Sequence, residues 1–179
     1  MRAHPPIQRA LLRTLALWFG LFVAANADGT MAVPVKLQIA LFTKLLGYDS
    51  KLAPLAGKWR VAVVHKVATD EVEAVVAAFR AAGVKAEAVD AATAVKKLDQ
   101  VDVVYLFPGV DAAALAPNCA KRGVITVSGD AGFAERGLAS MGLALKADGR
   151  PQVVINVSRL KLEGHDFPAQ VLGLAKIVR

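Results

Sequence analysis

A histidine, a serine and an aspartate follow apolar runs at positions where a ligand site or an enzyme uses such residues. His65 ends one run, and Ser128, Gly129 and Asp130 end another. In open α/β sheets, ligands bind beyond the carboxyl ends of the strands. These four residues are therefore the candidate ligand-binding residues of the chain. Serine, histidine and aspartate are also the residue types of a hydrolytic triad.

The spacing of these residues argues against a hydrolase. The serine lies in the sequence VSGD, which lacks the Gly-x-Ser-x-Gly pattern of a nucleophile elbow. The glycines Gly129, Gly132 and Gly137 match neither the dinucleotide-binding fingerprint nor the P-loop. A tight strand-to-helix turn, with Asp130 capping the helix that follows, explains this segment better. We expect no catalytic residues and no cofactor.

The sequence contains few residues that could bind a metal ion or carry out thiol chemistry. A two-histidine site would require His65 and His165 to converge, and nothing in their spacing predicts that they do. Cys119 is the only cysteine, which excludes an internal disulfide and a multi-cysteine metal site. Its thiol is buried and inert, paired with a second molecule, or catalytic, and we favour burial. We expect no metal site.

The amino end has the pattern of a signal peptide. Arg2, Arg9 and Arg13 precede an apolar stretch over residues 15–25, and small residues at 25 and 27 suit a signal peptidase. We predict cleavage after Ala27 and a periplasmic location. Retention as a membrane anchor is the alternative, but a spanning helix needs about 20 apolar residues.

Composition restricts the function classes further. The full chain has 22 basic and 15 acidic residues, and the leader removes three arginines, so residues 28–179 carry 19 minus 15, or +4. This weak positive charge is scattered, with few aromatic residues beside it, so we expect no nucleic-acid binding. The 152 residues that remain after cleavage at residue 27 of 179 are enough for one domain with its own core.

Strands that alternate with helices predict a single α/β domain over residues 28–179. Strand-like runs rich in valine are followed by capped helical segments, which favours a mostly parallel sheet with helices on both faces. Near the carboxyl end, alternation on both sides of Asp148-Gly149 predicts an antiparallel hairpin at the edge of the sheet. The predicted helices cover residues 35–48, 71–82, 91–98, 111–115 and 168–178, and the predicted parallel strands cover residues 60–65, 84–89, 101–107 and 124–127.

Four segments resemble the YfiR-like family of small periplasmic regulators. VITVSGDAGFAERG is similar to the family's strand that ends in serine and aspartate before a Gly-Phe-Ala turn. VVINVSRL resembles its strand with Ile-Asn, residues 171–178 resemble its terminal helix, and residues 35–46 resemble its first helix. The chain departs from the family in having LDQV where members commonly carry a cysteine, and DFPAQVLGL where the terminal helix is usually serine-rich.

The resemblance implies an exported, non-enzymatic regulator. It would bind and repress the periplasmic sensing domain of an inner-membrane protein, such as a diguanylate cyclase or a histidine kinase, and thereby lower cyclic di-GMP in the first case. The alternative is a periplasmic protein that binds a small ligand in the crevice around His65, Ser128 and Asp130. Pairing of two copies of the chain is left open.

Overall fold

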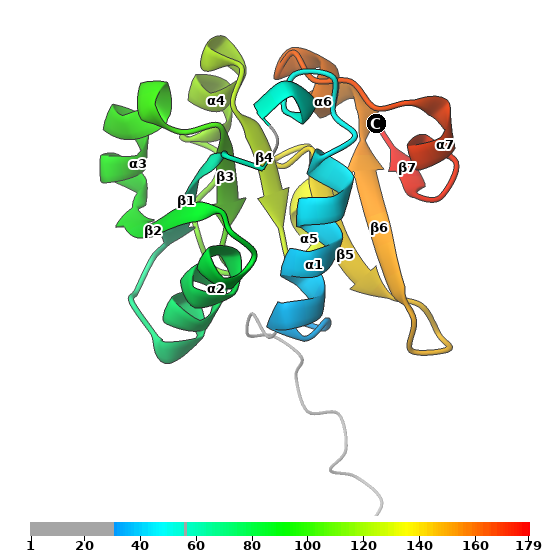
Figure 1. Ribbon diagram of the computed structural model, residues 1–179, viewed down its shortest axis with the longest axis horizontal. Coiled ribbons are helices and arrows are strands. Elements are labelled where there is room, and N and C mark those ends of the chain that lie inside the picture. The colour runs from blue at the N-terminus through cyan, green and yellow to red at the C-terminus, as the bar shows by residue number, and fades with distance from the viewer. Residues whose placement is uncertain (1–30, 56) are drawn as a thin grey trace, which may run out of the picture.

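The strands form one seven-stranded sheet in the order β2-β1-β3-β4-β5-β6-β7, as the computed structural model shows for residues 31–55 and 57–179 (Figure 1). The strands are β1 (Arg60–His65), β2 (Lys85–Asp90), β3 (Val103–Leu106), β4 (Ile125–Ser128), β5 (Met141–Leu145), β6 (Pro151–Asn156) and β7 (Lys176–Val178). The helices are α1 (Val35–Leu46), α2 (Asp70–Ala81), α3 (Ala91–Lys97), α4 (Ala116–Arg122), α5 (Ala131–Glu135), α6 (Val157–Leu162) and α7 (Ala169–Leu172), with short 3₁₀ turns η1 (Ala53–Leu55) and η2 (Leu98–Gln100).

Strands β2, β1, β3, β4 and β5 are adjacent in that order, and each neighbouring pair among them is parallel. The alternation of strands with helices predicted this arrangement for β1 to β4. Strands β1, β3 and β4 lie side by side in the centre, and every residue of β3 and β4 is buried. Continuous apolar runs suit such strands because both of their faces are covered. The α/β class and the helices on both faces are thereby confirmed.

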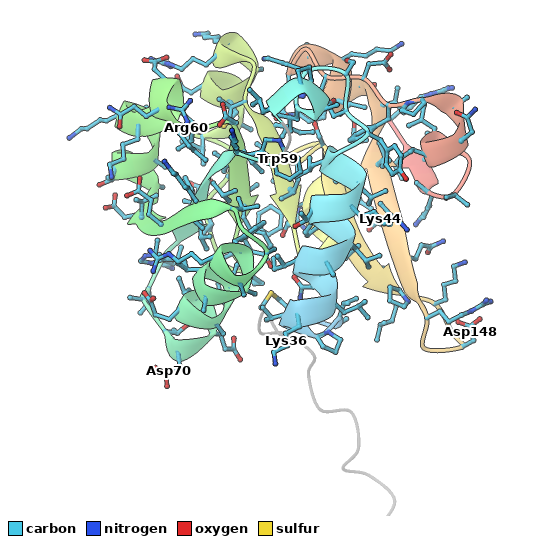
Figure 2. All side chains as sticks on the ribbon, viewed as in Figure 1. Lys36, Lys44, Trp59, Arg60, Asp70 and Asp148 are labelled. Carbon is cyan, nitrogen blue, oxygen red and sulfur yellow. The ribbon has the colours of Figure 1, made fainter. Side chains whose placement is uncertain are left out.

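Helices α1 and α2 lie in front of the sheet and α5 lies behind it (Figure 1). The ring of Tyr105, on β3, contacts Phe42 of α1 and Phe79 of α2 edge-to-face, with centroids 6.2 and 5.9 Å apart. Such edge-to-face aromatic pairs are favourable beyond the area that they bury. Through Tyr105, β3 therefore helps to fix the positions of both front helices. Lys36 and Lys44 lie near the two ends of α1 (Figure 2).

The predicted hairpin is confirmed. Strands β5 and β6 pair antiparallel, with Met141 opposite Ile155 and Leu145 opposite Pro151. Gly149 has φ of 77°, the left-handed conformation that this turn needs and that glycine adopts without strain.

The helix predicted over residues 168–178 forms only in its first part, and the strand that follows differs from the terminal helix that the resemblance to the YfiR-like family implies. Helix α7 ends at Leu172, and β7 then pairs in parallel with β6, so that Ile177 lies opposite Ile155. Leu174, between α7 and β7, is 83% exposed. Pairing with β7 gives the backbone N–H and C=O groups of β6 hydrogen-bond partners. The free energy gained by this pairing outweighs the local preference for a helix.

Two other elements also differ from expectation. The helix expected at residues 111–115 lies one turn later as α4, with Leu115 at the N-cap and Pro117 in the first turn, where proline is tolerated. Val157 does not extend the hairpin but begins α6, which the sequence analysis missed. Asn156 caps that helix by accepting a hydrogen bond from the Arg159 amide at 2.8 Å.

The predicted signal peptide at residues 1–27 lies outside the described residues. Among the residues that the structure describes, no helix is both long and apolar enough to cross a membrane.

Candidate functional site

The structure brings the four predicted ligand-binding residues to the same edge of the sheet. His65 ends β1 and Ser128 ends β4, and β3 lies between these two strands. The register places Val64 opposite Leu106, and Leu106 opposite Ser128. Neighbouring strands are about 4.8 Å apart, so two strand spacings separate His65 from Ser128.

Ser128 supports the turn and is not placed as a nucleophile. Its side chain is fully buried, and its hydroxyl donates to the Leu106 carbonyl at 2.8 Å. The same oxygen accepts a hydrogen bond from the Asp130 amide at 3.1 Å. The hydroxyl proton is therefore committed to a backbone carbonyl.

Gly129 lies directly beneath α1. A Cβ atom at this position would clash with the Gln38 side chain and would come within 2.6 Å of the Tyr105 hydroxyl. Tyr105 donates to Gln38 Oε1 at 2.7 Å, and burial raises the pKa of Tyr105, so the phenol keeps its proton. Glycine fits here because the Gln38 side chain and the Tyr105 hydroxyl occupy the space that a Cβ atom would fill.

Asp130 and His65 complete this edge. Asp130 caps α5 by accepting from the Gly132 amide at 2.8 Å, as the sequence analysis expected. Nδ1 of His65 is buried and has no hydrogen-bond partner among the described residues. Among the described residues, this edge therefore has one buried histidine nitrogen without a partner, whereas the Ser128 and Asp130 side chains are already bonded to backbone groups.

An apolar groove lies between α1 and α2, with a volume of about 740 Å³. We call it the α1–α2 groove. Its walls are mostly alanine, and Ala40, Ala74 and Ala77 are exposed to solvent. The lining residues are Pro34, Val35, Lys36, Ile39, Ala40, Ala74, Ala77, Ala78, Ala81 and Ala82. Short side chains allow the backbone of another molecule to approach closely, and Lys36 is the one charged residue of the lining.

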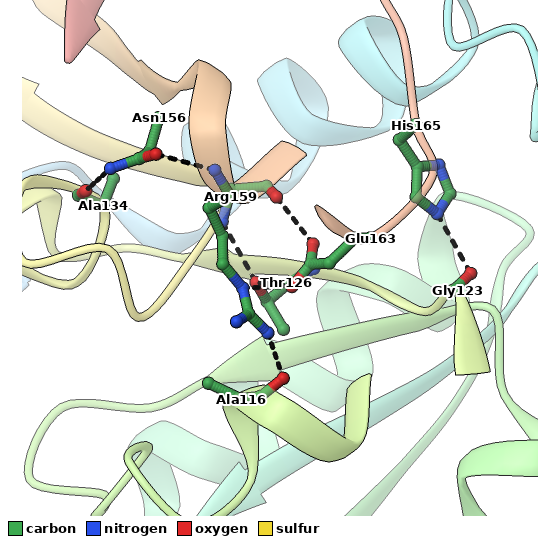
Figure 3. A network of polar contacts seen from close by, with 9 residues as sticks. Ala116, Gly123, Thr126, Ala134, Asn156, Arg159, Glu163 and His165 are labelled. Atoms are coloured by element: carbon green, nitrogen blue, oxygen red, sulfur yellow. Dashed lines mark hydrogen bonds and ion pairs between the residues drawn. The ribbon is translucent and has the colours of Figure 1, made fainter. Parts of the chain in front are cut away.

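A buried charged cluster joins α6 to β4 and β5 (Figure 3). The carboxylate of Glu163 accepts from the Thr126 amide at 2.9 Å, the Thr126 hydroxyl at 2.7 Å and the Ser140 hydroxyl at 2.6 Å. Arg159 donates to the same carboxylate at 2.8 Å and also to the Ala116 carbonyl. Every oxygen of the carboxylate is satisfied, which a buried charge requires.

A second buried pair lies at the amino end of β4. Nδ1 of His165 is 3.0 Å from Asp49 Oδ1, and its Nε2 is 3.1 Å from the Gly123 carbonyl oxygen. His65 lies at the opposite edge of the parallel sheet, since it ends β1 whereas Gly123 precedes β4. The two histidines therefore do not converge, and among the described residues no cluster of three or more metal-ligating side chains occurs.

Cys119 is buried in α4, which confirms the interpretation that we favoured. Burial raises the pKa of its thiol to about 12, and the nearby Glu163 carboxylate acts in the same direction. The reactive thiolate is therefore scarce at neutral pH.

The sequence analysis missed both buried pairs. The four-residue spacing of Arg159 and Glu163 is a helical ion-pair signal, but it occurs on many exposed helices. Asp49 and His165 are 116 residues apart, and no local pattern connects them.

Comparison with known proteins supports the fold alone. No family model and no curated protein match this sequence. A conserved domain protein from Vibrio cholerae O1 biovar El Tor is similar in structure, with a TM-score of 0.60, 16% identity, and coverage of 82% of this chain and 60% of that one. The ABC domain from Streptococcus pneumoniae in complex with L-Trp has a TM-score of 0.61, 15% identity, and coverage of 81% and 62%. This chain thus spans about six tenths of the length of both solved structures, whose similarity to it is that of an α/β fold.

Proposed function

We propose that this chain is an exported, non-enzymatic regulator that binds and represses the periplasmic sensing domain of an inner-membrane signalling protein. A diguanylate cyclase or a histidine kinase is the expected class of partner. The resemblance of the sequence to YfiR-like regulators motivates the proposal. The observation that carries it in the structure is the open α1–α2 groove.

The carboxyl edge of the sheet and the α1–α2 groove differ in how far the protein's own side chains cover them. At the carboxyl edge of the sheet, Gln38 and Tyr105 cover Gly129, and the Ser128 hydroxyl is committed to a carbonyl. The α1–α2 groove, in contrast, leaves Ala40 and Ala77 exposed. Exposed apolar surface of this kind is typical of a protein-binding site. The arrangement favours a macromolecular partner over a reaction at the strand ends.

Repression would follow from preferential binding to one state of the partner. A ligand shifts a two-state equilibrium only by the difference between its affinities for the two states. A regulator that binds the inactive arrangement of a sensing domain therefore holds the sensor inactive without any chemistry. An amphipathic helix of the sensing domain fits a groove bounded by two helices.

The test is a titration of the purified protein against the isolated sensing domain of a membrane cyclase or kinase encoded beside it. Ala40→Glu is the variant designed to disrupt binding, because it places a charge in the groove. The new carboxylate lies four residues from both Lys36 and Lys44, so we expect α1 to remain folded. We expect affinity to fall by at least about tenfold, or about 1.4 kcal/mol. Ala92→Glu, at an exposed position of α3 away from the groove, is the control. Absence of a complex at tens of micromolar, or equal losses in both variants, would contradict the proposal.

A second candidate is a protein that binds a small ligand at the carboxyl edge of the sheet. The unpaired Nδ1 of His65 favours it, because a buried polar atom without a partner is costly unless a ligand satisfies it. The Streptococcus protein with a similar fold holds L-Trp, so L-Trp is a suitable first probe. Calorimetric binding of L-Trp that is lost in His65→Gln would support this candidate over the regulator.

A further inference from the structure

Both ring nitrogens of His165 face oxygen acceptors. Nδ1 meets a carboxylate oxygen of Asp49 at 3.0 Å, and Nε2 meets the carbonyl oxygen of Gly123 at 3.1 Å. Neutral imidazole has one N–H donor, so only the doubly protonated ring satisfies both contacts. The His165 and Asp49 side chains are both fully buried, so water does not replace a missing donor.

Asp49 is held as a carboxylate by its other contacts. Oδ1 accepts from the amides of Lys51 at 3.0 Å and Leu52 at 2.9 Å, and Oδ2 accepts from the Asp166 amide at 3.2 Å. Burial acts to raise the pKa of Asp49, but the hydrogen bond and charge of His165, together with these amides, lower it below its ordinary value. Asp49 therefore meets the His165 ring as a carboxylate.

Three other charged side chains near this pair have partners of their own. Lys51, from the turn after α1, donates its ammonium to the same Gly123 carbonyl. Glu163, two residues before the histidine, is bonded to Arg159, and Arg122 at the end of α4 is paired with Asp99. Among the described residues, the carboxylate that contacts the ring is that of Asp49.

We propose that Asp49 and His165 form a proton-operated latch that holds the segment after α6 against the turn after α1. The latch is reinforced by the Ser50 amide, which donates to the Asp166 carbonyl at 3.2 Å. The segment that it holds continues into α7 and β7. As pH rises and the ring loses a proton, a nitrogen lone pair faces an oxygen and the latch opens. Protonation of Asp49 in strong acid removes the same pair, so the latch is closed only between these two limits.

Amide hydrogen exchange between pH 5 and 9 tests the latch. In the wild-type protein, we expect protection of residues 166–178, relative to β1, to fall by up to about tenfold for each pH unit once the ring carries a single proton. His165→Gln should show low protection in this segment at every pH. His65→Gln, which changes the other described histidine, should behave as the wild type does. The same pH dependence in His165→Gln as in the wild type would overturn the proposal.

The imidazole ¹⁵N signals of the wild-type protein provide a test that does not depend on a variant folding. The latch requires two protonated ring nitrogens in His165 while residues 166–178 are protected, and loss of one proton when protection falls. A singly protonated ring in the protected state would overturn the proposal, as would loss of protection with no change in the ring.

Discussion

The two ends of the parallel strands are held together by different chemistry. At the carboxyl end, the contacts are between neutral groups or are caps, such as Tyr105 to Gln38 and Ser128 to Leu106. At the amino end, buried acidic and basic side chains, Asp49 with His165 and Glu163 with Arg159, tie distant segments together. The loss of one partner of a buried ion pair leaves an uncompensated charge, whereas loss of a neutral partner leaves only an unpaired dipole. We therefore expect the amino end to be the more sensitive to substitution and to pH.

The largest expected effect is that of Glu163→Gln. The substitution leaves the buried Arg159 charge without its partner and sets an amide against the donors of Thr126 and Ser140. We expect a loss of about 3–5 kcal/mol in the free energy of unfolding, measured by urea denaturation. Glu135→Gln removes the exposed ion pair with Lys176 and should cost at most about 1 kcal/mol. Similar losses in the two variants would refute the contrast between buried and exposed pairs.

Asp49→Asn is expected to cost about 2–3 kcal/mol at neutral pH, because the charged acceptor of His165 and three amides becomes neutral. The folded protein lowers the pKa of Asp49 below 3.8, so its contribution is fully present above that value and is lost as pH falls through the folded-state pKa. Urea denaturation from about pH 5 to pH 2 should therefore show a steeper loss of stability in the wild type than in the variant. Parallel pH profiles would show that Asp49 carries no such linkage.

At the carboxyl end, Gly129→Ala should cost about 1–3 kcal/mol because the methyl group overlaps Gln38 and Tyr105. The Gln38 side chain and the Tyr105 ring must shift to accept it, so the near-ultraviolet circular dichroism of Tyr105 should change as well. Gly132→Ala is the control, since the nearest atom there belongs to the flexible Arg136 side chain. A more stable Gly129→Ala protein would mean that α1 does not lie as close to the turn as described.

The smallest expected effect is that of Asp130→Ala, which removes the cap of α5 and should cost about 1 kcal/mol in a thermal or urea unfolding experiment. Asp130→Asn keeps an acceptor for the Gly132 amide and should recover most of that loss. A loss several times larger would indicate that Asp130 has a further role at this edge, as the small-ligand candidate requires.

Local patterns predicted the elements whose burial and capping are set by their own residues. The valine-rich run of β1, the Asp130 cap of α5 and the Asp148-Gly149 turn each carry a signal within a few residues. The same logic placed His65, Ser128, Gly129 and Asp130 at one edge of the sheet, because the carboxyl ends of parallel strands meet there. It did not show that α1 covers Gly129, since that contact joins segments far apart in the chain.

The carboxyl-terminal segment illustrates where local reasoning fails. Residues 171–178 have apolar residues at helical spacing, and the chain nevertheless forms β7, because β6 offers unpaired backbone groups at the sheet edge. The pairing partner is absent from the local window, so no propensity scale could reveal it.

The sequence by itself determined the α/β class, the order of the main strands and helices, and the residue types at the strand ends, since these follow from periodicity and capping within short windows. The tertiary structure alone decided that Asp49 meets His165 and that Glu163 meets Thr126 and Ser140. It also decided that a groove lies open between α1 and α2. The physical reason is that a buried charge is stable only when its partners converge in space, and that convergence depends on the whole fold and not on neighbours in the chain.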